Sequence, residues 1–205
     1  MRICIKIIIK TLTNTSIKQD NNMKKLILFL LFFIINYAFS QDKIITKTGI
    51  IAFESLYLTA FQDVKATNEE VTGVLNPKTG DFACLGLIKG FRFEVALMEE
   101  HFNENYMESD TYPKAVFRGQ IQNFDVKQLT ASDKEYFMKG TLELHGKTKE
   151  MMVIAKIRKS NLFGIELSTM FYVLAGDFGI PIPSVVKGKV SEKMKVNAAF
   201  KFQSK

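Results

Sequence analysis

Hydrophobic and polar residues alternate along most of the chain. In GFRFEVAL (90–97), Phe91, Phe93, Val95 and Leu97 fall on one face of an extended chain and charged residues on the other. The same period of two recurs in KAVFRGQI (114–121), MKGTLELHG (138–146), EMMVIAKI (150–157), GIELSTMFYV (164–173) and EKMKVNAAFKF (192–202). With GIIAFES (49–55), EVTGVLN (70–76) and DFACLGLI (81–88), the pattern predicts about nine strands.

One polar face per strand favours antiparallel pairing, because the strands of a doubly wound parallel sheet are apolar on both faces. Short strands joined by turns such as NPKTGD (76–81) and HGKTKE (145–150) indicate an all-β sandwich or closed barrel. The inward faces are rich in Phe, Met, Leu and Val. Such faces line either a packed core or an apolar cavity, and periodicity taken alone favours the packed core.

Two segments interrupt the alternation. ALMEEHFNENYMES (96–109) places Met98, Phe102 and Tyr106 at intervals of four, which predicts one or two helical turns with an apolar stripe toward the barrel. Its acidic residues face water in this interpretation, and Tyr112-Pro113 then directs the chain into the next strand. The glycine- and proline-containing stretch 174–190 predicts a rim loop with a short helix.

The N-terminal region has the layout of a secretory signal peptide. Two lysines follow Met23, ten apolar residues run from Leu26 to Ile35, and Ala38-Phe39-Ser40 precedes Gln41. We therefore expect residues 1–22 to be a dispensable upstream extension, residues 23–40 to be the signal peptide, and cleavage to occur near Ser40/Gln41. Residues 41–205 then form a single domain of ordinary size.

Removing the leader also removes most of the positive charge. The chain has 28 basic and 21 acidic residues, and residues 1–40 hold six of the former and one of the latter, which leaves +2. A charge this small excludes a nucleic-acid interface. Cys84 is then the one cysteine of the mature chain, so no internal disulfide is expected, and its apolar neighbours predict a buried, unreactive thiol.

Candidate catalytic groups are few. His101 shares a helical face with Glu104, and His145 lies in a predicted turn, so a metal-dependent enzyme centred on His101 and Glu104 is the weakest of the hypotheses. The sequence has no Gly-x-Ser-x-Gly, phosphate-binding glycine loop or His-Glu-x-x-His motif. We therefore predict no catalytic residue, no metal and no cofactor.

Several motifs taken together resemble the YceI-like family of exported, lipocalin-like polyisoprenoid-binding proteins. They are LMEEHFNENYMESDTYPKAVFRGQI (97–121), GTLELHGKTKEMMV (140–153) and AGDFGIPIP (175–183). The resemblance spans about residues 48–203. It implies an eight-stranded antiparallel barrel with a helical connector, an apolar tunnel for a long isoprenoid or fatty chain, export to the periplasm, and no catalysis.

The resemblance shifts the interpretation of the interior toward a ligand cavity. The predicted partner is then an amphiphilic lipid, such as an isoprenoid, quinone or fatty acid. The protein is expected not to span the membrane, and an exposed barrel edge can support a homodimer. Strand parity selects the predicted wall residues Phe91, Phe93, Phe117, Leu142, Leu144, Val153, Phe171 and Phe200, with Met98, Phe102 and Phe178 near the openings. The alternative is a filled barrel that acts as a structural or interaction protein.

Overall fold

Antiparallel strand pairing builds the domain, and nine strands occur in the part of the chain that the computed structural model describes, residues 43–55, 64–162, 164–182 and 191–203. The strands are β1 (Ile44–Ser55), β2 (Lys65–Leu75), β3 (Asp81–Leu87), β4 (Arg92–Phe93), β5 (Lys114–Ile121), β6 (Lys134–Leu144), β7 (Lys147–Ser160), β8 (Gly164–Leu174) and β9 (Lys193–Phe202). Short helical elements lie between them: η1 (Ile88–Gly90), α2 (Ala96–His101), η2 (Phe102–Tyr106), η3 (Val126–Gln128) and η4 (Ala175–Phe178).

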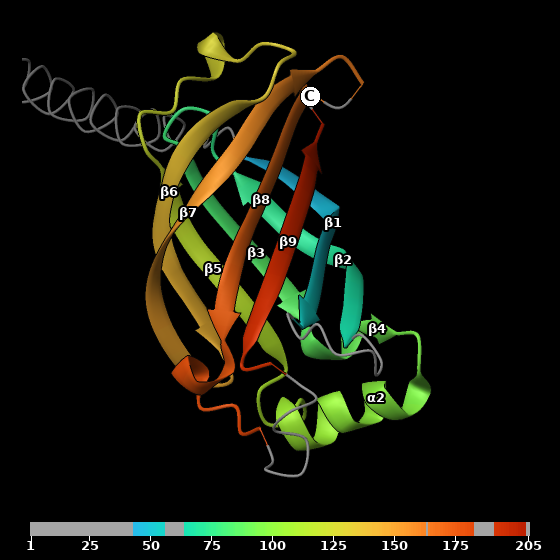
Figure 1. The fold of residues 1–205 in the computed structure, drawn as a ribbon. Coiled ribbons are helices and arrows are strands. Elements are labelled where there is room, and N and C mark those ends of the chain that lie inside the picture. Colours follow the sequence, from blue (N-terminus) through green and yellow to red (C-terminus); the bar gives the residue numbers. More distant parts are fainter. Residues whose placement is uncertain (1–42, 56–63, 163, 183–190, 204–205) are drawn as a thin grey trace, which may run out of the picture. The chain divides into compact units, whose positions relative to one another are not determined.

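The sheet closes on itself. Neighbouring strands follow the order β1-β9-β8-β7-β6-β5-β3-β2, and β1 also pairs with β2, so eight strands form a ring (Figure 1). The ninth, β4, pairs only with the beginning of β2, through Ala66 and Phe93. The prediction of an eight-stranded antiparallel barrel with a helical connector is confirmed.

Side-chain parity follows the sequence pattern. On β7, Val153, Ala155 and Ile157 are buried, whereas the intervening Met152 and Ile154 are exposed. The hairpin from β6 to β7 keeps one register from Lys134–Ile157 to Leu144–Lys147. Its turn consists of His145 and Gly146, whose φ angles of 48° and 70° match the left-handed pair that a two-residue hairpin turn requires.

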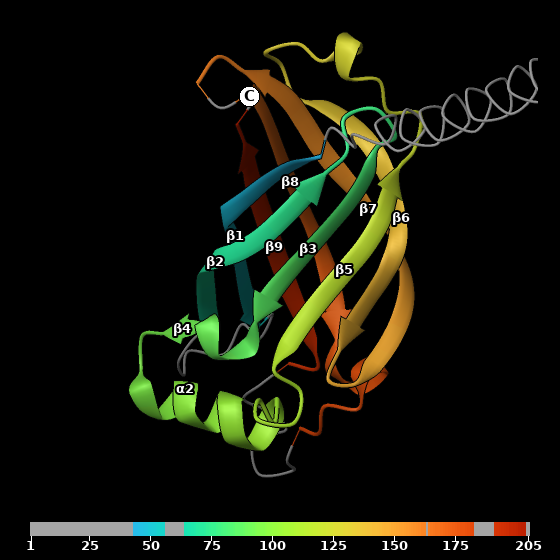
Figure 2. The ribbon, with the colours of Figure 1, turned by 180° about the vertical axis from the view of Figure 1, so that it is seen from behind.

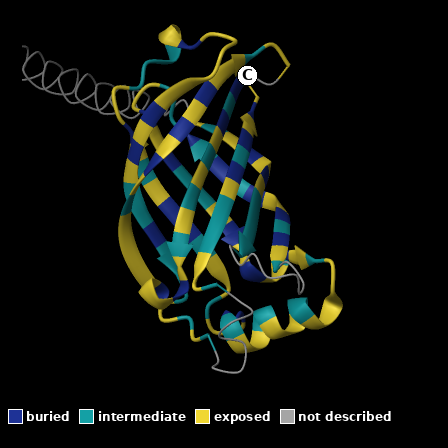
Figure 3. Cartoon of the chain, viewed as in Figure 1, coloured by how far each residue is buried: buried dark blue, intermediate teal, exposed yellow. Residues whose placement is uncertain are grey.

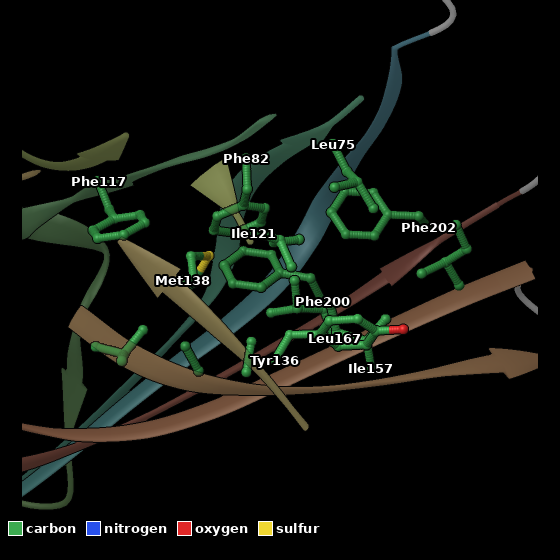
Figure 4. Packing of buried hydrophobic residues seen from close by; sticks show 14 of the residues in the cluster. Leu75, Phe82, Phe117, Ile121, Tyr136, Met138, Ile157, Leu167, Phe200 and Phe202 are labelled. Atoms are coloured by element: carbon green, nitrogen blue, oxygen red, sulfur yellow. The ribbon is translucent and has the colours of Figure 1, made fainter. Parts of the chain in front are cut away.

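The inward side chains fill one half of the barrel. Phe82 lies 5.2 Å from Phe200 and 6.5 Å from Phe202 between ring centroids, and these rings form the centre of the buried cluster in Figure 4. Two glycines make room for Phe200: a Cβ on Gly49 would lie 2.5 Å from its ring, and one on Gly73 would lie 2.6 Å away. Small residues therefore determine where the largest rings can pack.

One predicted strand is wrong in most of its length. Only Arg92 and Phe93 of the segment 90–97 form a paired strand, and Val95 and Leu97 are exposed instead of inward-facing. The Glu99 carboxylate explains the early end, because it accepts hydrogen bonds from the Phe93 backbone N–H at 3.1 Å and from Arg92 Nη1 at 2.8 Å. The chain is thereby turned into α2 directly after β4.

The two predicted interruptions are present. The connector folds into α2 followed by the π-helical turn η2, and both views place α2 at the end of the barrel where β8 ends and β9 begins (Figures 1 and 2). The described part of the rim segment contains the 3₁₀ turn η4. Residues 183–190 of the predicted rim loop lie outside the described residues, as do residues 1–42 with the predicted signal peptide.

The close contact between Gly140 on β6 and Gly119 on β5 predicts how a larger residue would change stability. A Cβ on Gly140 would lie 2.6 Å from Cα of Gly119 and 2.7 Å from Cζ of Phe117, whereas one on Gly176 would meet nothing within 4 Å. We expect Gly140→Ala to lower the free energy of unfolding by about 1–3 kcal/mol through overpacking, and Gly176→Ala to be near neutral. Urea unfolding of both variants measures this, and equal stability of the two would contradict the packing described here.

Candidate functional site

The half of the barrel next to α2 is hollow. It contains a cavity of about 330 Å³. The lining residues are Ile51, Phe53, Val64, Gly86, Ile88, Phe91, Phe93, Met98, His101, Phe102, Tyr106, Met107, Ala115, Leu142, Leu144, Phe171, Val173, Ala175, Ile180, Ile182, Met194 and Val196. The interior is therefore neither wholly packed nor wholly hollow.

The cavity continues the core along the same inward faces. On β9, Phe200 and Phe202 are fully buried in the core, whereas Met194 and Val196 line the cavity and are only partly buried. On β8 the order is reversed, from buried Leu167 to partly buried lining residues near the strand's end, as the strands run in opposite directions. Figure 3 shows the change from buried to intermediate residues along these two strands.

Small residues create part of the space. Gly86 on β3 and Ala115 on β5 are register partners, and both line the cavity. A Cβ on Gly86 would make only ordinary contacts, 3.6 Å from Val71 and 4.0 Å from Ile51. Larger side chains at these two positions would occupy the volume that is now empty.

Aromatic rings form the wall on the side of the connector. Phe53 of β1 lies 5.4 Å from Phe91, 5.9 Å from Phe93 and 5.4 Å from Phe102 between ring centroids. These four rings join a barrel strand to β4 and to the helical connector. Because aromatic pairs at such distances stabilise each other beyond the area they bury, the cluster attaches the connector to the barrel.

The wall is almost entirely apolar. Among the lining residues only His101 and Tyr106 have a nitrogen or hydroxyl group in the side chain, and both belong to the helical connector. The other lining side chains are alkyl, thioether or phenyl groups, or the hydrogen of glycine. Such a wall can hold a hydrocarbon chain, and the two polar groups can orient one polar end of it.

The structure brings together most of the predicted site residues. Of the predicted walls, Phe91, Phe93, Leu142, Leu144 and Phe171 line the cavity, as do Met98 and Phe102 of the predicted openings. Phe117, Val153, Phe200 and Phe178 do not line it and belong to the buried core instead. The side chains of Phe117, Val153 and Phe200 point inward as expected, but they pack into the core beyond the cavity, and Phe178 of η4 packs against that core from the rim.

Sequence reasoning missed several lining residues. Phe53 and Ile51 lie on a predicted strand, GIIAFES, and Met194 and Val196 share the alternation of Phe200 in EKMKVNAAFKF, so parity contains their signal. Ala115 shares the alternation of Phe117 in KAVFRGQI, but a small side chain gives no sign of an adjacent void. Ile180 and Ile182 come from the rim segment, where no periodicity applies.

The histidines have different surroundings. His101 lines the cavity, whereas the side chain of His145 is buried, with Nδ1 3.2 Å from the carbonyl oxygen of Phe178 and its ring centroid 4.4 Å from that of Tyr112. His145 Nε2 lies 3.6 Å from the Glu108 carboxylate. His145 thus joins the β6–β7 turn to the connector and to η4. In the described ranges, no three His, Cys, Asp or Glu residues are grouped to hold a metal ion.

Cys84 packs against the core from β3. Burial raises the pKa of its thiol to about 12, against a smaller opposite effect of a hydrogen bond with the Phe117 backbone. The thiol therefore stays protonated near neutral pH and is a poor nucleophile.

The sequence matches the YceI-like domain over residues 44–202. The chain belongs to the YceI-like domain family. No curated protein matches the sequence significantly. No helix in the described ranges is long and apolar enough to cross a membrane.

Three solved structures share the fold. A domain from Saccharophagus degradans, described as a polyisoprenoid binding domain implicated in plant cell wall breakdown, has 13% sequence identity and a TM-score of 0.69, and covers 81% of this chain and 100% of its own. Burkholderia cenocepacia BcnA has 12% identity and a TM-score of 0.60, with 74% and 94% covered. A Campylobacter jejuni YceI protein has 16% identity and a TM-score of 0.56, with 73% and 91% covered.

The raised pKa of Cys84 gives a labelling prediction. We expect the folded protein to react with iodoacetamide at neutral pH far more slowly than the urea-unfolded protein, because the folded state holds the thiol protonated. Mass spectrometry of the modified peptides measures this, and Cys84→Ala reports any contribution from Cys4. Fast labelling of the folded state at Cys84 would contradict the burial.

The raised pKa of Cys84 also makes the folding stability depend on pH. The unfolded thiol ionises near pH 9 and the folded one near pH 12, so the folded state loses stability as the pH rises between these values and is unaffected below them. Cys84→Ala should remove this part of the alkaline destabilisation.

Proposed function

We propose that this protein binds a long-chain amphiphile, such as an isoprenoid, a quinone or a fatty acid, in the apolar cavity of its barrel, and that it carries the ligand without transforming it. The observation that supports this most directly is the position of the empty volume. The cavity is confined to one half of a barrel whose other half is densely packed, and aromatic and aliphatic side chains form its wall.

The energetics favour a hydrocarbon ligand. Each methylene group moved from water into such a wall contributes roughly 0.8 kcal/mol, so a chain of modest length is held without any specific polar contact. His101 and Tyr106 lie at the connector, where they can meet a polar head group. The Saccharophagus degradans relative, described as polyisoprenoid-binding, has the same fold and supports the isoprenoid among these candidates.

The composition of the wall also supports binding without catalysis. Alkyl and phenyl groups neither transfer protons nor attack a substrate, and the polar lining side chains are one histidine and one tyrosine. The thiol of Cys84, whose pKa is raised to about 12, is unsuited to nucleophilic chemistry.

The proposed site of action is the periplasm or the extracellular space. The support lies in the N-terminal sequence, where the lysines after Met23, the apolar run Leu26 to Ile35 and the Ala38-Phe39-Ser40 segment have the layout of a cleavable export signal. An exported carrier would move an amphiphile through water, in which free hydrocarbon chains are poorly soluble.

The test is to purify the protein from a bacterial periplasm and to combine native mass spectrometry with solvent extraction of bound lipid. A discrete adduct of isoprenoid, quinone or fatty-acid mass is the expected result. A protein that is free of adduct, and stays so after incubation with quinones and fatty acids, would overturn the proposal in favour of a barrel that acts through its surface.

Filling the cavity should weaken binding while keeping the fold. We expect Ala115→Phe to weaken binding of a fluorescent fatty acid by about tenfold or more, because a phenyl ring displaces at least two methylene groups of the ligand. Ala83→Phe is the matched control: its register partner is Arg118, and it lies outside the cavity. Fluorescence titration measures both affinities, and circular dichroism checks the fold. Unchanged affinity of a folded Ala115→Phe variant would place the ligand elsewhere.

A further inference from the structure

Strands β7 and β8 separate before they reach the cavity end of the barrel. Their register runs from Ser160–Gly164 to Ala155–Thr169 and continues no further in the described residues. Each strand remains paired on its other side, β7 with β6 as far as Lys147 and β8 with β9 as far as Leu174. The separation is therefore a local opening in the wall and not a frayed end.

A side-chain hydrogen bond marks the point of separation. Thr169 Oγ1 donates to the Ile154 carbonyl oxygen at 2.8 Å, immediately beyond the last register pair. This bond satisfies the carbonyl that the ladder leaves unpaired. At the far end of the opening, the Lys149 ammonium group forms an ion pair with the Asp177 carboxylate of η4. Both ends of the opening are thus held by polar contacts.

A groove of about 430 Å³ occupies the opening, and we refer to it as the seam groove. Its lining residues are Leu142, Lys149, Met151, Met152, Val153, Ile154, Met170, Phe171, Tyr172, Val173, Leu174, Asp177 and Phe178. They include inward-facing residues, such as Val153, and outward-facing residues, such as Met152. The groove therefore extends through the thickness of the wall.

The seam groove and the cavity share side chains. Leu142, Phe171 and Val173 line both. Phe171 and Val173 are only partly buried, and on the side facing β7 they lie beyond the last register pair of the β7–β8 ladder. Rotation of such side chains needs no broken ladder, and the exposed ones rotate within nanoseconds.

The outer rim of the seam groove is apolar and faces water. Met152 is 64% exposed, Met170 48%, Ile154 46%, and Tyr172 and Leu174 45% each. Single exposed apolar residues are ordinary, but a contiguous group beside a groove indicates a surface that contacts an apolar partner. The two methionines are flexible and polarisable, which suits an irregular hydrocarbon chain.

We propose that the seam groove receives the distal end of the bound chain, so that a chain longer than the cavity passes between β7 and β8 and lies against the outer apolar rim. This inference rests on the proposed function. Its occupant is the ligand's own hydrocarbon, because the groove is continuous with the cavity through shared side chains. Each methylene group returned to water would weaken binding about fourfold, so a long chain gains affinity from the seam and a short one does not.

The test closes the seam and compares chain lengths. The background carries Cys4→Ala and Cys84→Ala, so that no other thiol reacts. In the test variant, Met152→Cys and Tyr172→Cys are joined by a cleavable bismaleimide. In the control variant, Lys156→Cys and Ser168→Cys are joined in the same way. The control pair lies where β7 and β8 are already in register. Binding of farnesol, a short prenol, and solanesol, a long one, is measured by native mass spectrometry from detergent micelles.

Closure of the seam should weaken solanesol binding by about tenfold or more, leave farnesol binding unchanged, and be reversed when the linker is cleaved. The control pair should affect neither ligand. Unchanged solanesol binding, or an equal loss for both prenols, would overturn the inference. If neither prenol binds before cross-linking, this inference fails with the isoprenoid form of the proposed function, and the quinone and fatty-acid incubations decide whether the proposed function itself fails.

A second variant avoids cross-linking. Met170→Glu places a charge on the rim of the seam groove, and Ser168→Glu places the same charge two residues away on the same outward face of β8. We expect Met170→Glu to weaken binding of solanesol and not of farnesol, and Ser168→Glu to weaken neither. Equal solanesol affinity of the two variants would contradict the proposed path of the chain.

Discussion

The barrel closes where β1 bends over the ring of Phe200. The register between β1 and β2 shifts on both sides of Gly49, and from Ile50 onward β1 pairs with β9 while it stays paired with β2 as far as Glu54–Lys65. Gly49 and Gly73 lack the Cβ atoms that would collide with that ring. The closed ring sends every second side chain into one enclosed interior. That interior can then be filled or left empty at each level along its axis.

This protein does both. Phenyl rings and large aliphatic side chains fill the half around Phe82, Phe200 and Phe202, and this packing keeps the strands in register. Toward α2 the inward positions include small residues such as Gly86 and Ala115. The helical connector completes the enclosure with Phe102. The packed half thus provides stability, and the hollow half is available for a ligand. A bound hydrocarbon ligand would pack against the inward side chains of the hollow half, as core side chains do in the packed half.

The opening between β7 and β8 is the route by which the proposed ligand would extend out of the barrel. A closed barrel with complete ladders confines its ligand to the volume it encloses, whereas a barrel with one interrupted ladder can hold a chain of variable length. The cost of the interruption is limited, because Thr169 satisfies the freed carbonyl of Ile154 and the Lys149–Asp177 ion pair holds the other end. On the proposed path of the chain, the exposed apolar rim is part of the binding surface.

The sequence by itself determined the strands, their antiparallel pairing and which side chains point inward, because parity is a local property with a period of two residues. It also determined the helical connector and the type of wall, as Phe91, Leu142 and Phe171 illustrate. Only the tertiary structure decided that Phe117 and Phe200 belong to packed core, because depth along the barrel axis depends on register between distant strands. The early end of β4 and the seam likewise follow from contacts, those of Glu99 and Thr169, that no local pattern contains.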